Sequence, residues 1–138
     1  MPMRAKVFLD TNILLYATSE DISERGKRDR ARELLDFEGI GFSVQVLGEF
    51  YVNATRKMKL PEKEVTAVLE SLGNYPILPL TESVFWSALE HRKRYQVSYW
   101  DGAIIAAAME LGCHTVFSED FSHGQTYGTI RVLNPFVD

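Results

Sequence analysis

The stretch Val7-Phe8-Leu9-Asp10-Thr11-Asn12 decides the fold of this chain. Its three apolar residues favour a strand, the strand ends abruptly at the carboxylate of Asp10, and a helical pattern follows at once. A strand, a polar turn and a helix in this order are typical of an α/β unit, where ligands bind outside the carboxyl ends of the strands. Asp10 thus stands where such folds carry their chemistry, although an Asp that merely caps the helix fits this stretch equally well.

The rest of the chain alternates helical patterns with short apolar strands, and the change from strand to carboxylate recurs at Ser118-Glu119-Asp120. Helices are expected over residues 24–37, 44–58, 60–73, 81–95 and 99–111, and strands over 39–43, 76–80, 114–117 and 130–133. This alternation predicts an α/β fold with a parallel sheet that is covered by helices on both faces.

Length and composition favour one ordinary folded domain over residues 1–138, because 46% of the residues are hydrophobic and 25% are charged. No apolar run approaches the roughly 20 residues of a membrane span, and the single Cys113 cannot form an internal disulfide. We therefore expect a cytoplasmic protein without a signal peptide. The net charge of −4 argues weakly against a protein that simply coats nucleic acid, but not against an enzyme that holds its backbone through metal ions.

Four carboxylates interrupt the apolar pattern, and two of them, Asp10 and Asp120, follow strands. The other two, Glu49 and Asp101, lie on helices that a right-handed α/β winding can bring over the same sheet edge. Four ionised carboxylates in one pocket repel one another unless protons or divalent cations neutralise them. An oxygen-only ligand set favours Mg²⁺ or Mn²⁺, which activates water for attack on phosphorus, and the three scattered histidines make no zinc motif.

The two helical acids have bland alternatives. Glu49 is expected beside the apolar side of its helix, where it needs a partner, but Glu on a helix is solvated by default. Asp101 begins a nearly apolar helix, with Trp100 beside it, that we expect to be buried on most sides; stabilisation by the helix dipole would also explain an Asp there. The expected apolar side of the helix with Glu49 comprises Val44, Leu47, Phe50, Tyr51, Ala54 and Met58.

These residues together resemble the PIN domain family, and most closely its VapC-type toxins of toxin–antitoxin pairs. The resemblance covers essentially the whole chain and lies in four short fragments, which are Leu9-Asp10-Thr11-Asn12, the surroundings of Glu49, Tyr99-Trp100-Asp101-Gly102-Ala103 and Ser118-Glu119-Asp120. It implies a three-layer α/β/α sandwich with a short central parallel sheet. It also implies a metal-dependent endoribonuclease of single-stranded RNA, a homodimer, and inhibition by a cognate antitoxin that blocks the acidic pocket.

The resemblance also assigns residues. Asp10, Glu49, Asp101 and Asp120 match the acidic quartet of the family, expected to be catalytic and to bind Mg²⁺ or Mn²⁺. Thr11 and Ser118 match hydroxyl positions that orient the site, and Asn12 lies beside them. Glu119 is expected to point away from Asp120, and Gly102 stands where many relatives have Ala.

A basic stretch is the remaining candidate for function. Arg25, Arg28 and Arg32 fall on one face of the predicted helix over residues 24–37, where they could contact RNA or a protein partner. A solvated surface is the more common fate of such a run.

Two other classes of function remain open at this point. An acidic pocket at strand ends also serves phosphoacceptor and phosphatase-like domains, but no Lys follows Lys93 and position 12 is Asn, where an Asp-x-Asp phosphatase has Asp. A catalytically silent module that binds RNA or protein is the other alternative, and an intact acidic quartet argues against it.

Overall fold

The computed structural model describes residues 3–137, and its centre is a sheet of six strands in the order β3-β2-β1-β4-β6-β5. Neighbouring strands run parallel except at one edge, where β5 and β6 form an antiparallel pair. The strands are β1 (Val7–Leu9), β2 (Ile40–Ser43), β3 (Ile77–Leu78), β4 (Thr115–Phe117), β5 (Thr126–Tyr127) and β6 (Ile130–Leu133). The carboxyl ends of the parallel strands β1, β2 and β4 therefore lie along one edge of the sheet.

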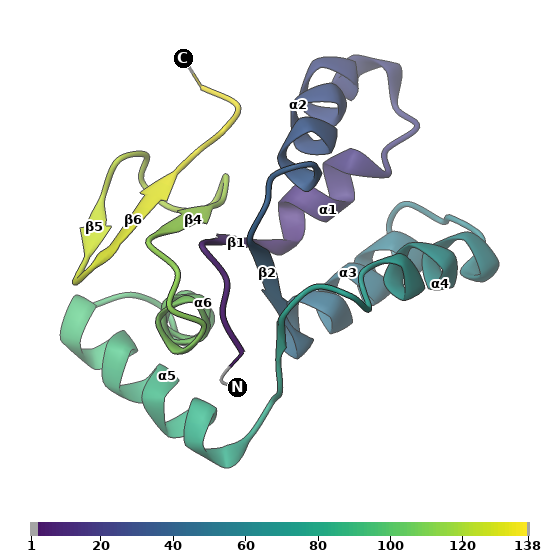
Figure 1. Cartoon of the computed structure of the whole chain (residues 1–138). Coiled ribbons are helices and arrows are strands. Elements are labelled where there is room, and N and C mark those ends of the chain that lie inside the picture. The colour runs from purple at the N-terminus through teal and green to yellow at the C-terminus, as the bar shows by residue number, and fades with distance from the viewer. Residues whose placement is uncertain (1–2, 138) are drawn as a thin grey trace.

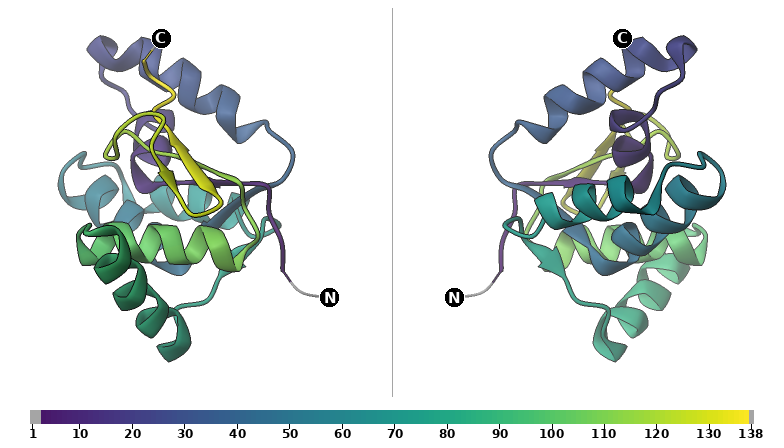
Figure 2. Two further views of the ribbon diagram at one scale, coloured as in Figure 1. Left: turned by 90° about the vertical axis from the view of Figure 1, so that its left-hand side faces the viewer. Right: turned by 90° about the vertical axis from the view of Figure 1, so that its right-hand side faces the viewer.

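Helices cover both faces of this sheet, as Figures 1 and 2 show, with α1 and α2 on one side and α5 and α6 on the other. They are α1 (Thr11–Ala17), α2 (Arg25–Leu35), α3 (Val44–Arg56), α4 (Glu62–Ser71), α5 (Glu82–Tyr95) and α6 (Tyr99–Glu110), with a short 3₁₀ turn, η1 (Ile22–Glu24), before α2. The predicted α/β sandwich is confirmed. In the part of the chain that the structure describes, no helix is long and apolar enough to span a membrane.

Side-chain caps fix where the main helices begin. Ser43 ends β2 and accepts a hydrogen bond from the backbone of Val46, so that α3 starts directly at the sheet edge. Ser98 caps α6 in the same way by accepting from the backbone N–H of Asp101. The caps fix where α3 and α6 begin, and these two helices carry the predicted site residues Glu49 and Asp101.

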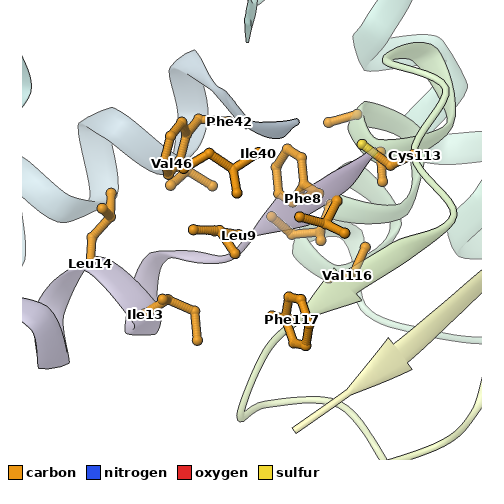
Figure 3. Close-up of a cluster of buried hydrophobic side chains, with 14 of the residues drawn as sticks. Phe8, Leu9, Ile13, Leu14, Ile40, Phe42, Val46, Cys113, Val116 and Phe117 are labelled. Atoms are coloured by element: carbon orange, nitrogen blue, oxygen red, sulfur yellow. The ribbon is translucent and has the colours of Figure 1, made fainter. Parts of the chain in front are cut away.

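The core lies where β1 meets the helices on either face (Figure 3). Phe8 and Leu9 are fully buried, and their side chains point to opposite faces because residues alternate along a strand. Phe42 and Val46 lie to one side in the close-up, and Val116 and Phe117 of β4 to the other. The buried apolar residues that precede Asp10 thus anchor β1 in the core and fix the position of its carboxyl end.

Helices α5 and α6 approach closely at Gly102. A Cβ atom there would stand 2.6 Å from the backbone oxygen of Ala88 and 2.9 Å from the backbone nitrogen of Arg92. Real Cβ contacts of that length to backbone are not tolerated, so an alanine would push the two helices apart. The glycine, which the sequence marked as a departure from many relatives, is what permits this close approach.

Three details of the predicted elements are wrong. The strand β5 falls in a segment that was expected to be a polar loop, because two residues are too short a run to show an alternating pattern. Val44 and Tyr51 of α3 are exposed, and Val46 takes the buried place in that helix. Trp100 is 62% exposed, since the buried part of α6 begins only at Gly102.

Candidate active site

Asp10 is the best fixed of the predicted site residues. It ends β1 directly before α1 and is only 6% exposed. Its Oδ1 accepts a 2.7 Å hydrogen bond from the backbone N–H of Thr11, and its Oδ2 accepts one of the same length from the hydroxyl of Ser118. Asp10 is also the N-cap of α1, so the capping and site interpretations of this residue coexist.

Burial sets the electrostatics of Asp10. Removal from water raises the pKa of this carboxyl from 3.8 to about 6, against the opposing effect of the hydrogen bonds from Ser118 and Thr11. The negative charges of Asp120 and Glu49 raise the pKa further. Asp120 and Glu49 therefore lie close enough to Asp10 for their charges to act on it, a repulsion that a bound cation would relieve.

Ser118 and Asn12 connect Asp10 to Asp120. The hydroxyl of Ser118 donates to Asp10 and accepts a 3.1 Å hydrogen bond from the backbone N–H of Asp120. The side-chain amide of Asn12 donates to Oδ2 of Asp120 at 3.1 Å, and its oxygen accepts from the backbone N–H of Glu119 at 3.3 Å. Two residues beside the β1 and β4 strand ends thus orient an exposed carboxylate relative to a buried one.

Asp101 and Glu49 approach the same edge from helices. Burial, followed by the negative charge of Asp120, raises the pKa of Asp101, which is half-buried in the first turn of α6. The charge of Glu49 on α3 contributes to the raised pKa of Asp10. The Oε1 atom of Glu49 accepts a 2.9 Å hydrogen bond from the side-chain amide of Gln45. Asp10 is thus affected by the charges of Asp120 and Glu49, and Asp101 by the charge of Asp120.

The acids stand apart in the arrangement that the structure shows. Over residues 3–137, no group of three or more His, Cys, Asp or Glu side chains is already placed to hold a metal ion. Thr11 supplies a further polar atom, since its Oγ1 is buried and has no hydrogen-bond partner among the described residues. Acidic side chains whose charges raise the pKa of Asp10, together with an unpartnered hydroxyl, are the kind of oxygen donors that a hard cation prefers.

Glu119 points away from this pocket into a network that the sequence did not reveal. Its Oε1 accepts a hydrogen bond from the hydroxyl of Tyr16 at 2.7 Å, and its Oε2 pairs with Nζ of Lys27 at 2.5 Å. Lys27 also lies 4.8 Å from the centre of the Tyr16 ring. The network ties α1 and α2 to the loop that carries Asp120, and no local pattern could predict contacts between residues about a hundred positions apart.

The three arginines of α2 have different surroundings. Arg32 donates from Nε to the backbone oxygen of Ala17 at 2.9 Å, so it completes the C-terminal end of α1. Arg28 lies 3.4 Å from the carboxylate of its neighbour Asp29, and Arg25 is exposed. Among the described residues, none of the three arginines forms a hydrogen bond or ion pair with the four predicted acids, so a role in contacting RNA or a partner stays a prediction.

An α/β fold with acidic residues at the carboxyl ends of β1 and β4 and on two neighbouring helices is the class that this geometry defines. The profile of the PIN domain family matches residues 7–128. The chain therefore belongs to the PIN domain family, which confirms the resemblance seen in the sequence. No curated protein sequence matches it significantly.

Solved structures with the same fold are toxins and their complexes. The chain is similar to the sarcin–ricin loop cleaving toxin VapC20 of Mycobacterium tuberculosis, with 19% identity, a TM-score of 0.67, and coverage of 83% of this chain and 92% of that one. A toxin–antitoxin complex from Klebsiella pneumoniae gives 17% identity, a TM-score of 0.71, and coverage of 95% and 98%. The DNA-bound VapBC of Salmonella typhimurium gives 20% identity, a TM-score of 0.65, and coverage of 93% of this chain and 96% of that one.

Proposed function

We propose that this protein is a metal-dependent endoribonuclease that hydrolyses phosphodiester bonds in single-stranded RNA. The observation that carries the proposal is the strand-end carboxylate of Asp10, which two hydrogen bonds fix, while burial, and to a smaller extent the charges of Asp120 and Glu49, raise its pKa. Groups with perturbed pKa values of this kind concentrate at sites of chemistry. Membership of the PIN domain family supports the same conclusion.

Mg²⁺ or Mn²⁺ is the cofactor that suits these donors. Asp10, Asp101 and Asp120 would hold it, with Glu49 completing the set or positioning the attacking water. When bound, such an ion neutralises the carboxylates, binds phosphate oxygens and lowers the pKa of water. Histidine and cysteine take no part in this set, which favours a hard ion over zinc.

The residues of the chain contribute by position and proton affinity. Ser118 holds the Asp10 carboxylate in one orientation through its 2.7 Å hydrogen bond, and Asn12 does the same for Asp120. Gln45 restrains Glu49 through the hydrogen bond to its Oε1. With a pKa of about 6, Asp10 is largely ionised at pH 7 and becomes protonated below pH 6.

We further propose that the protein is the toxin of a type II toxin–antitoxin pair, acting in the cytoplasm as a homodimer. The similarity to structures of toxin–antitoxin complexes supports this role. An antitoxin that covers the acidic pocket would hold the enzyme inactive. A DNA-binding antitoxin encoded directly beside this protein, which restores growth when both are expressed, is the expected observation.

RNA cleavage by the Asp10→Asn variant tests the enzymatic proposal. We expect the wild-type protein to cleave a single-stranded RNA in Mg²⁺ or Mn²⁺ and to lose this activity on addition of EDTA. Asp10→Asn should fold and have no activity, whereas the matched control Asp29→Asn, an exposed acid on α2, should cleave like wild type. Undiminished cleavage by a folded Asp10→Asn protein would show that the site is elsewhere. Absence of both cleavage and binding of Mg²⁺ or Mn²⁺, measured by calorimetry, would favour the silent binding module.

A further inference from the structure

Four aromatic rings form a continuous series on the surface of α5 and α6. The ring centres of Trp86 and Phe85 are 5.2 Å apart, those of Phe85 and Tyr99 are 5.9 Å apart, and those of Tyr99 and Trp100 are 5.0 Å apart. Each ring is tilted or edge-on to the next one. We call these four residues the aromatic ridge.

Most of the ridge faces water. Trp100 is 62% exposed, Trp86 is 56% exposed and Phe85 is 40% exposed. Tyr99 is the anchor, because it is partly buried and packs against a small cluster of alanines on the two helices, Ala88, Ala103 and Ala106. The fold gains little from leaving two tryptophans in solvent, so packing does not account for the ridge.

One end of the ridge is next to a predicted site residue in the chain. Trp100 directly precedes Asp101, whose pKa is raised by burial and by the charge of Asp120. Both residues belong to the first turn of α6, so the ridge and this acid share one helix end. Because Gly102 permits the close contact with Arg92, the start of α6 also lies beside the last turn of α5.

That last turn of α5 is basic. Arg92, Lys93 and Arg94 are all exposed, and the structure shows no ion pair for any of them among the described residues. Flat rings for bases and cations for phosphates are the combination with which proteins bind single-stranded nucleic acid. The same cations would repel an identical surface on a second copy of the chain, which argues against a self-contact at this place.

We propose that the aromatic ridge stacks the bases of single-stranded RNA next to the cleavage site, with Trp100 as the first platform. The proposal rests on the proposed function, because it takes RNA as the substrate of the neighbouring acids. Stacking on an exposed ring is tolerant of sequence, since every base has a flat face. The ridge therefore provides affinity and direction for the strand rather than recognition of a particular base.

The two tryptophans of the chain, Trp86 and Trp100, both belong to the ridge, so intrinsic fluorescence reports on it directly. The experiment titrates a 12-nucleotide single-stranded RNA of mixed sequence into the uncleaving Asp10→Asn protein. Trp86→Phe and Trp100→Phe are each made in that background. Each variant keeps a single tryptophan and retains an aromatic ring at the substituted position. We expect RNA to quench Trp100 strongly and Trp86 less, and duplex RNA of the same sequence to quench neither.

Affinity is measured in parallel by fluorescence anisotropy of labelled RNA. Trp100→Ala should weaken binding about tenfold, as expected for the loss of one stacked base. The control Leu80→Ala removes an apolar side chain that is also 62% exposed but lies outside the ridge, and it should bind like its parent. Circular dichroism of each variant excludes unfolding as the cause.

Each possible result either supports or overturns the proposal that the aromatic ridge stacks RNA bases. Quenching of Trp100 together with weaker binding by Trp100→Ala supports the ridge, even if the wild-type protein cleaves no RNA, a failure that would concern only the proposed function. Cleavage by wild type without quenching, and with unchanged affinity in Trp100→Ala, overturns the ridge and leaves the ribonuclease intact. A change from dimer to monomer in Trp100→Ala with unaltered RNA affinity also overturns it, in favour of a contact between two copies.

Discussion

The acidic edge has two halves that the fold treats differently. Asp10 and Ser118 are buried at the ends of β1 and β4, where hydrogen bonds fix both side chains. Asp120 is exposed, and Glu49 and Asp101 are only partly buried on their helices. The fold therefore spends stability to hold one carboxylate in place and leaves the others free to move onto a ligand. Predictions that separate the two halves test this division.

The largest expected effect is on stability. Because folding raises the pKa of Asp10 from 3.8 to about 6, the folded state binds more protons than the unfolded state between these pH values. The contribution of Asp10 to the free energy of unfolding is therefore fully present below pH 4 and is lost as the pH rises through 6. At pH 7 the ionised Asp10 costs about 3 kcal/mol on this basis, since each pKa unit is worth about 1.4 kcal/mol.

Asp10→Asn removes that cost together with one charged hydrogen-bond acceptor. We expect the variant to be more stable than wild type at pH 7 by about 2 kcal/mol, and the difference to shrink toward pH 4. Urea denaturation in EDTA at pH 4, 5.5 and 7 measures it. A difference that does not depend on pH would show that Asp10 is not strained by burial.

The second prediction concerns Ser118, which contacts both the buried Asp10 and the exposed Asp120 of the acidic edge. Ser118→Ala loses the hydroxyl that donates to Asp10 and accepts from the backbone of Asp120, so cleavage should fall about 10- to 100-fold, as for other residues that orient a metal ligand. The pKa of Asp10 should rise because the charged form loses a donor. The acidic limb of the pH–rate profile in Mn²⁺ should then move to higher pH.

An exposed serine of the same loop provides the control for that profile. Ser122→Ala should leave the rate and the acidic limb where they are in wild type, since the Ser122 side chain is exposed and forms no hydrogen bond with the acids among the described residues. If Ser118→Ala also leaves both unchanged, the buried half of the site does not depend on this hydroxyl.

The sequence indicates the strand-end acids because its strongest signals are local. Asp10 and Asp120 each follow a strand, and this pattern is visible without any structure. The apolar residues of α3 fall on more than one side of the helix, so periodicity alone predicts that Val44 and Tyr51 are buried. The packing of α3 against α1 and α4 buries Val46 instead. The exposure of Trp100 was missed because an apolar helix does not reveal where its burial begins.

The smallest expected effect lies in the network behind the site. Lys27 pairs with Glu119 across two partly exposed side chains, and such pairs are worth about 0.2–1 kcal/mol. Lys27→Ala should therefore lower the free energy of unfolding by less than about 1 kcal/mol and reduce cleavage by about fivefold at most. A loss as large as that of Ser118→Ala would mean that this network, and not the strand ends, positions Asp120.

Binding of Mn²⁺, measured by isothermal titration calorimetry at pH 7.5, tests the central claim most directly. The claim is that Asp10 anchors a hard-metal site which the more exposed acids complete. We predict that the wild-type protein binds Mn²⁺, that Asp10→Asn and Asp101→Asn lose this binding while remaining folded, and that Asp29→Asn retains it. Binding of Mn²⁺ that is equal in all four proteins would contradict the claim.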